Sequence, residues 1–146
     1  MRVIRHRWRA RAAVLIATAA ASVGIGVIAA SPATTTTSGT GVSVVLDEWK
    51  LTPSRATVRP GRITFVVRND GSMLHEFVVL RTDRAAKGLP IRGGKAVEAG
   101  RRGKLAQMAS GASKRLSLRL GSGKYVLICN LLGHYQAGQA ATLRVR

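Results

Sequence analysis

The residues of this chain best suited to chemistry lie in one short stretch near its C-terminus, CNLLGHYQAGQ, residues 129–139. Cys129 is the only cysteine among the 146 residues, and His134 and Gln139 follow it at equal intervals. A Cys-x4-His-x4-Gln spacing lets one tight loop place three side chains around a single point. Soft thiolate and imidazole donors in one loop are typical of a transition-metal site.

A second imidazole is available from His75, which begins the apolar run HEFVVLR after an Asn-Asp-Gly turn. In a β-sandwich the ends of two strands can lie side by side at one pole, so His75 can join the C-terminal loop. Two His and one Cys with a weak fourth donor form the ligand set of a blue-copper site. The candidate metal ligands are therefore His75, Cys129, His134 and Gln139, for one copper ion per chain.

Each candidate also has a simpler interpretation when it is taken alone. A lone Cys129 is more often a buried apolar residue, and a lone His75 a core histidine. The simpler interpretation of Gln139 is a surface glutamine in a turn. Zinc also binds a His2CysGln site, and Met73 and Met108 are spare thioether donors. The combined pattern favours the metal site.

The part of the chain that carries these residues is predicted to be all-β. Short runs rich in β-branched and aromatic residues are separated by Pro-Gly, Asn-Asp-Gly and Gly-Ser-Gly turns, a pattern that favours a sandwich over a βαβ fold. The expected strands span residues 42–46, 62–68, 75–81, 114–120, 124–130 and 140–146. Strands 75–81 and 124–130 are apolar on both faces, so something must cover their second face. The basic segment 83–112, in which residues 104–108 can add a strand, is the candidate.

The N-terminus predicts export from the cytoplasm. Five arginines among the first eleven residues precede an uncharged apolar run over residues 12–30, and small residues follow it. This pattern is typical of a secretory signal peptide, with an uncleaved membrane-anchor helix as the alternative. We therefore expect a signal or anchor at 1–33, a flexible linker at 34–41 and a domain at 42–146, located extracytoplasmically. An unpaired Cys129 in that compartment is open to oxidation unless a metal holds it.

The charge of the chain is strongly basic, with 24 Lys and Arg against 6 Asp and Glu. The basic residues are spread over many strands and the chain has few aromatic residues for base stacking, so nucleic acid is not an expected partner. The charge instead favours an anionic membrane surface or an acidic redox partner protein. The domain is expected to be a monomer.

Residues 42–146 resemble a small cupredoxin, the plastocyanin and azurin family of blue-copper proteins with a Greek-key β-sandwich. The likeness rests on NDGSMLHEFVVL at 69–80, Pro-Gly at 60–61, and GKYVLICNLLGHYQAGQAATLRV at 123–145. It implies that His75, Cys129 and His134 are equatorial copper ligands. Gln139 aligns with the family's axial methionine, as in the stellacyanin branch, and a harder oxygen donor should lower the reduction potential.

Two further positions depart from the family pattern. Leu132 replaces the usual proline of the ligand loop, and Glu76 stands where plastocyanins have an asparagine that ties the ligand loops together. The support around the ligands should therefore differ. The resemblance also implies a surface-exposed His134, surrounded by an apolar patch of Leu131, Leu132 and Tyr135.

The expected function is one-electron transfer without enzymatic activity, since oxidases of this family need additional histidine clusters. The alternative is extracytoplasmic copper sequestration or delivery to a copper acceptor, which uses the same ligands. A metal-free adhesion module on the same scaffold is a third class, and the retention of all three strong ligands argues against it.

Overall fold

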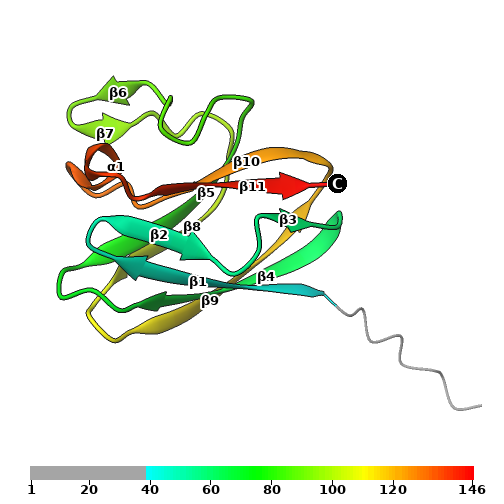
Figure 1. Cartoon of the computed structure of the whole chain (residues 1–146), viewed down its shortest axis with the longest axis horizontal. Helices are drawn as coiled ribbons and strands as arrows, with labels where there is room; N and C mark the ends of the chain where they lie inside the picture. The colour runs from blue at the N-terminus through cyan, green and yellow to red at the C-terminus, as the bar shows by residue number, and fades with distance from the viewer. Residues whose placement is uncertain (1–38) are drawn as a thin grey trace, which may run out of the picture. The chain divides into compact units, whose positions relative to one another are not determined.

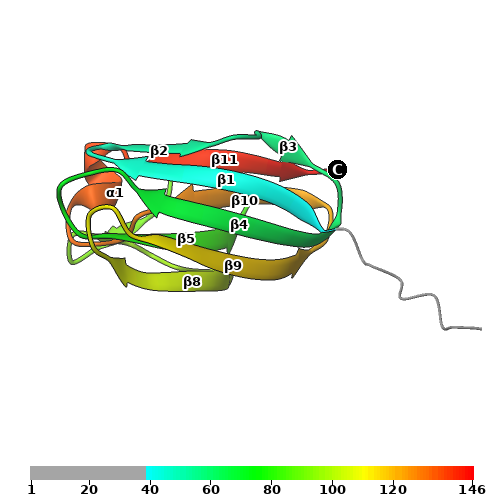
Figure 2. The same ribbon diagram turned by 90° about the horizontal axis from the view of Figure 1, so that it is seen from below.

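Two β-sheets packed face to face make up residues 39–146, the part of the chain that the computed structural model describes (Figure 1, Figure 2). The four-stranded sheet has the order β2 (Lys50–Pro53), β1 (Thr40–Asp47), β4 (Gly61–Asn69), β9 (Ser113–Leu120). The five-stranded sheet has the order β3 (Thr57–Val58), β11 (Ala140–Val145), β10 (Gly123–Ile128), β5 (His75–Arg81), β8 (Arg101–Met108). A small ribbon of β6 (Ile91–Arg92) and β7 (Lys95–Ala96) and the one-turn helix α1 (His134–Ala137) complete the described part.

The chain changes sheet repeatedly along its course. It crosses from one sheet to the other between β2 and β3, between β3 and β4, between β4 and β5, between β8 and β9, and between β9 and β10. This connectivity confirms the predicted all-β sandwich. The predicted signal or anchor helix at 1–33 lies outside the described residues. Within residues 39–146, no helix is both long and apolar enough to cross a membrane.

Every strand predicted from the sequence is present, with ends that differ by up to three residues. β1 begins at Thr40, inside the segment expected to be linker, because its first residues pair with Ile63 and Thr64 of β4. β10 ends at Ile128, so Cys129 follows the strand and is not its last ladder residue. The short elements β2, β3, β6, β7 and α1 were not predicted, because two to four residues carry too little periodicity.

The main core fills the space between the two sheets. Alternate residues of β1, β4 and β9 point inward, as their periodic sequences predict, and they meet Phe77 and Val79 of β5. Phe65 and Phe77 pack at a ring-centroid distance of 5.3 Å across the sheets. This apolar layer makes the sandwich a stiff support for the loops at its ends.

A second apolar cluster covers the outer face of β5 and β10. Val78, Leu80, Val126 and Ile128 point away from the main core and pack against Leu89, Ala96 and Tyr135. Leu89 and Ala96 belong to the basic segment 83–112, which confirms the predicted covering role of that segment. The same segment also supplies β8, which pairs with the edge of β5.

The hydroxyl of Tyr135 connects the segment 83–112 to the loop between β10 and β11 by two hydrogen bonds. It donates to the carbonyl of Ala86 at 2.9 Å and accepts from the backbone N–H of Leu89 at 2.8 Å. Residues 35–146 form one compact unit. Because this unit contains both sheets and both apolar clusters, we expect it to fold on its own.

We expect Tyr135→Phe to lower the free energy of unfolding of residues 35–146 by about 1–3 kcal/mol, because it leaves the buried N–H of Leu89 without a partner. Urea denaturation followed by circular dichroism measures the change. Tyr125→Phe is the matched control, since the Tyr125 hydroxyl donates to the carbonyl of exposed Gly121, which water can satisfy instead. Equal losses in the two variants would contradict the role given to Tyr135.

Candidate metal centre

The pairing of β5 with β10 places the first two candidate ligands side by side. The two strands are antiparallel, with Val78 opposite Ile128, so the start of β5 lies beside the end of β10. His75 is the first residue of β5, and Cys129 directly follows β10. The 54-residue separation in sequence thus becomes a direct contact, with 3.7 Å between His75 Nδ1 and Cys129 Sγ.

The loop between β10 and β11 supplies the other two candidates. Ile128 pairs with Ala140, so Gln139 lies next to Cys129, and the backbone N–H of Cys129 donates to the carbonyl of Gln139 at 3.1 Å. His134 begins α1 at the tip of the loop, after Gly133 with φ 80°. A left-handed conformation of this kind suits glycine, and it turns the chain so that His134 points back toward Cys129.

The three strong donors form a small triangle. His75 Nδ1 and His134 Nδ1 are 3.2 Å apart, and Cys129 Sγ lies 3.7 Å and 3.5 Å from them. With metal–nitrogen bonds of about 2.0 Å and a metal–sulfur bond of about 2.3 Å, a trigonal centre needs donor separations of roughly 3.5–3.7 Å. The three residues can therefore hold one metal ion, and they are all buried.

Gln139 is buried next to the triangle. Its carbonyl Oε1 lies 3.1 Å from His134 Nδ1. Its amide Nε2 donates to the backbone carbonyl of Asp47, at the end of β1. This hydrogen bond leaves the oxygen of the amide on the side of the histidine, and the alternative of a surface glutamine is excluded because Gln139 is 0% exposed.

The carboxylate of Glu48, which was not predicted from the sequence, contacts the outer ring nitrogen of His75. Glu48 Oε1 lies 3.1 Å from His75 Nε2, the ring nitrogen that faces away from Cys129. The carboxylate also accepts from the backbone N–H groups of Ser72 and Met73. A Cβ on Gly71 would collide with Glu48 Oε1, so glycine leaves room for the carboxylate. A carboxylate on the remote nitrogen sets the tautomer and orientation of a metal-binding imidazole.

Burial and hydrogen bonding set the protonation states of the cluster. The backbone N–H of Met73 is the largest cause of a lowered pKa at Glu48, so this carboxylate is ionised at neutral pH. Burial raises the pKa of the Cys129 thiol, which is therefore protonated at neutral pH in the absence of a metal. Burial, reinforced by His75, lowers the pKa of His134, so its imidazole is neutral and free to bind a metal.

Glu76 does not tie the ligand loops together as the family's asparagine does. Its backbone N–H donates to Cys129 Sγ at 3.3 Å, and its carboxylate pairs with Lys104 of β8 at 2.9 Å. Asn130 performs a tying role instead. Its side chain bonds the backbone of Ala96 in both directions and donates to Glu98, which joins the ligand loop to the covering segment. In this chain Asn130, and not the side chain of Glu76, therefore joins the ligand loop to its neighbour.

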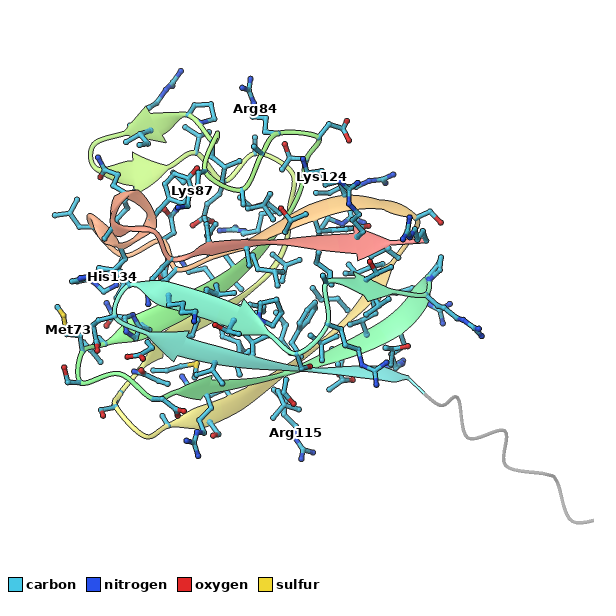
Figure 3. The ribbon with its side chains drawn as sticks, in the orientation of Figure 1. Met73, Arg84, Lys87, Arg115, Lys124 and His134 are labelled. Carbon is cyan, nitrogen blue, oxygen red and sulfur yellow. The ribbon has the colours of Figure 1, made fainter. Side chains whose placement is uncertain are left out.

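The surface around His134 differs from the predicted patch. Tyr135 is 4% exposed because its ring covers β5 and β10, and Leu131 is only half-buried. His134 itself is 6% exposed, and Trp49 packs edge-on against its ring at 5.1 Å. The exposed apolar side chains at this end are Leu132, Trp49, Met73 and Leu74. Figure 3 shows His134 and Met73 at this same end of the sandwich.

Sequence reasoning missed Glu48, Trp49 and Asn130. Glu48 and Trp49 lie in the turn between β1 and β2, and neither is close in sequence to a ligand. Their positions follow from the parallel pairing of β1 with β4, which puts Leu46 opposite Asn69 and so brings the turn to the loop before His75. The only signal for Asn130 was its position next to Cys129.

Comparison with known structures finds proteins of one fold. An auracyanin from Roseiflexus castenholzii matches with a TM-score of 0.57 and 18% identity, over 74% of this chain and 98% of that one. Auracyanin A of Chloroflexus aurantiacus, a "blue" copper protein, matches with a TM-score of 0.55 and 14% identity, over 75% and 100%. Rusticyanin from Thiobacillus ferrooxidans matches with a TM-score of 0.54 and 15% identity, over 75% and 79%.

No protein-family model matches the sequence, and no curated protein does. At identities below 20%, the structural matches establish the fold. The chain thus has the cupredoxin fold, as its resemblance implied, and the His75–Cys129–His134 cluster lies at one pole of it.

We expect Glu48→Gln to weaken the binding of Co(II) to residues 35–146 by about 10–100-fold, because it removes the charged acceptor from His75. Titration followed by the thiolate-to-cobalt absorption measures the affinity. Asp70→Asn is the matched control, since this carboxylate lies in the same loop region but pairs with exposed Arg68. An unchanged affinity in Glu48→Gln would show that the carboxylate does not support the ligand.

Metal binding should release about one proton at pH 7, since the Cys129 thiol has a raised pKa and must ionise, whereas His134 is already neutral. The Co(II) affinity should accordingly rise about tenfold per pH unit from pH 7 until the thiol pKa is reached. Proton release is measured with an indicator dye in weak buffer, and Cys129→Ser should abolish it. A pH-independent affinity over this range would contradict the protonated thiol.

Proposed function

We propose that this chain is a one-electron carrier with one mononuclear type 1 copper site. His75, Cys129 and His134 would bind the copper as its strong ligands, and Gln139 would be the weak fourth ligand. The observation that carries the proposal is the buried triangle of His75 Nδ1, His134 Nδ1 and Cys129 Sγ, with sides of 3.2–3.7 Å.

The donor set favours copper over other metals. Thiolate suits Cu(I), imidazole suits both oxidation states, and a trigonal His2Cys set with a weak axial donor is characteristic of electron-transfer copper. A copper ion held here supplies reversible one-electron chemistry by alternating between Cu(II) and Cu(I). The similarity to auracyanins and rusticyanin, of which one is described as a "blue" copper protein, supports this choice.

The residues around the site would hold the ligands in one geometry while the charge of the copper changes. Cys129, His75 and Gln139 are fully buried, so water is excluded. The backbone N–H of Glu76 donates to the sulfur, and Glu48 holds the His75 ring. Because these contacts come from a rigid sandwich, the ligands need not rearrange when an electron is gained or lost.

Gln139 would tune the potential of the site. An amide oxygen is a harder donor than a thioether, so it stabilises Cu(II) relative to Cu(I) and lowers the reduction potential. The position of Oε1 at 3.1 Å from His134 Nδ1 and the anchoring of Nε2 on Asp47 support this role. The negative charge of Glu48 acts in the same direction.

The partner would be a redox protein that docks on the end of the sandwich where His134 lies. Exposed Leu132, Trp49, Met73 and Leu74 offer an apolar contact surface beside the His134 ring. We place the domain outside the cytoplasm, on the strength of the basic and apolar N-terminal sequence. His75 and His134 are the only histidines of the described part, so we propose no second metal site and no catalytic activity.

Burial of the ligands argues for a carrier and against copper delivery. Transfer of Cu(I) to an acceptor requires an incoming ligand to reach the metal, whereas Cys129 and Gln139 are 0% exposed. An electron can pass through the imidazole of His134 without any ligand exchange.

Titration of residues 35–146 with Cu(II) tests the proposal. We expect an intense visible thiolate-to-copper band, saturating at about one equivalent, with the electron paramagnetic resonance spectrum of type 1 copper. Absence of the band would remove the electron-transfer role and favour zinc or a metal-free function.

Gln139→Met should keep the band and raise the reduction potential by roughly 60 mV or more, equivalent to about a tenfold shift of the Cu(I)/Cu(II) equilibrium for one electron. Gln136→Met is the matched control, because Gln136 is an exposed glutamine on the same loop. Equal spectra and potentials for Gln139→Met and the wild-type domain would place Gln139 off the metal.

A further inference from the structure

The charges of the domain are separated along the length of the sandwich. Of the six acidic residues, all but Asp83 lie toward the end that carries the candidate ligands, here called the ligand pole: Asp47, Glu48, Asp70, Glu76 and Glu98. The opposite end, where β4 and β10 begin and β9 and β11 end, carries exposed arginines. We call this end the basic pole and define it by Arg55, Arg59, Arg62, Arg119, Arg144 and Arg146.

The arginines of the basic pole have no ionic partners. Among the described residues, no ion pair includes any of the six, whereas Arg68, Arg101 and Lys104 elsewhere on the domain each pair with a carboxylate. Arg62 of β4 lies directly opposite Arg119 of β9. Like charges in that register destabilise a sheet, so an external anion between them would relieve the repulsion.

A hollow beside other arginines of the basic pole provides a second place for anions. It has a volume of about 530 Å³ and is lined by three arginines, Arg55, Arg59 and Arg146, together with Thr40, Thr57 and Val58. The guanidinium groups and the threonine hydroxyls are donors that suit phosphate oxygens. Within residues 39–146, no acidic residue lines this hollow.

The described chain also starts at this pole. Thr40 begins β1 there, and Gly39 packs closely against Arg62, since a Cβ on Gly39 would lie 3.2 Å from the Arg62 carbonyl oxygen. Figure 1 shows β1 starting at the same end as the C-terminus, away from α1. If the segment 12–30 is the uncleaved anchor, the eight residues 31–38 span at most roughly 30 Å and keep the bilayer within reach of the basic pole.

We propose that the basic pole binds the anionic headgroups of a phospholipid membrane and so holds the ligand pole away from the lipid. The inference rests on the extracytoplasmic placement in the proposed function and deepens it by giving the domain an orientation. β1 has eight residues and runs from one pole to the other, so the metal site would lie roughly 25 Å above the membrane surface. At that height the exposed apolar residues around His134 face a partner in solution and not the lipid.

Sedimentation with lipid vesicles tests the binding. Residues 35–146 should bind phosphatidylglycerol vesicles at about 0.1 M salt and should not bind phosphatidylcholine vesicles. The variant R59Q/R62Q/R119Q/R146Q should bind about a hundredfold more weakly, since each basic contact contributes about fivefold at most. The matched control K50Q/R92Q/K95Q/K114Q removes the same charge from exposed residues toward the ligand pole, and it should lose less than about tenfold.

Trp49 reports the orientation directly. It is the only tryptophan of residues 35–146, and it lies against His134 at the ligand pole. On vesicles with nitroxide-labelled headgroups, its fluorescence should stay unquenched, because the basic pole is the end in contact. Strong quenching of Trp49, or equal losses of binding in the two quadruple variants, would overturn the proposal.

Both measurements are made without copper, so they are independent of the titration that tests the type 1 site. If the domain forms the blue band but does not bind phosphatidylglycerol vesicles, the electron-transfer role stands and the proposed membrane contact is overturned. An acidic protein would then be the occupant of the basic pole. A domain that binds vesicles through the basic pole but forms no blue band keeps the membrane contact and loses the proposed function.

Discussion

The antiparallel contact between β5 and β10 is the constraint on which the candidate site depends. These strands lie inside the five-stranded sheet and are buried on both faces, so their register is set by two apolar clusters at once. A shift by one residue would exchange the side chains of the two clusters. Because the register is held so strictly, His75 and Cys129 meet at a separation that suits one metal ion.

The rest of the site is built on that contact by short local connections. The loop between β10 and β11 must return within a few residues, which brings Gln139 beside Cys129 and holds His134 over both. Asp47 and Glu48 lie at and just after the end of β1, in the other sheet. The carbonyl of Asp47 accepts from the Gln139 amide, and the carboxylate of Glu48 contacts the His75 ring. The four candidate ligands therefore lie on or next to strands of one sheet, whereas the groups that orient two of them come from the end of β1 in the partner sheet. Separation of the sheets would loosen the centre even with every ligand retained.

The basic segment 83–112 is a structural part of the domain as well as a source of charge. It closes the outer face of β5 and β10 and is fastened to the ligand loop through Tyr135 and Asn130. Its lysines and arginines project outward from this cover, so they add to the charge of the surface without entering the core. Within residues 39–146, the largest group of arginines without an ion pair nevertheless lies elsewhere, on the strand ends at the basic pole.

The amino-acid sequence by itself determined the class of fold and the identity of the candidate ligands. Alternating residues in 114–120 and doubly apolar runs at 75–81 and 124–130 are local patterns, and they predict strands and their buried faces without any long-range information. The single cysteine with its spaced histidine and glutamine is equally local. The tertiary structure alone decided the roles of Glu48, Asn130 and Trp49, and the burial of Tyr135. These roles depend on which strands are neighbours. The order of the strands is set by the packing of the two sheets, and a local sequence pattern does not contain that information.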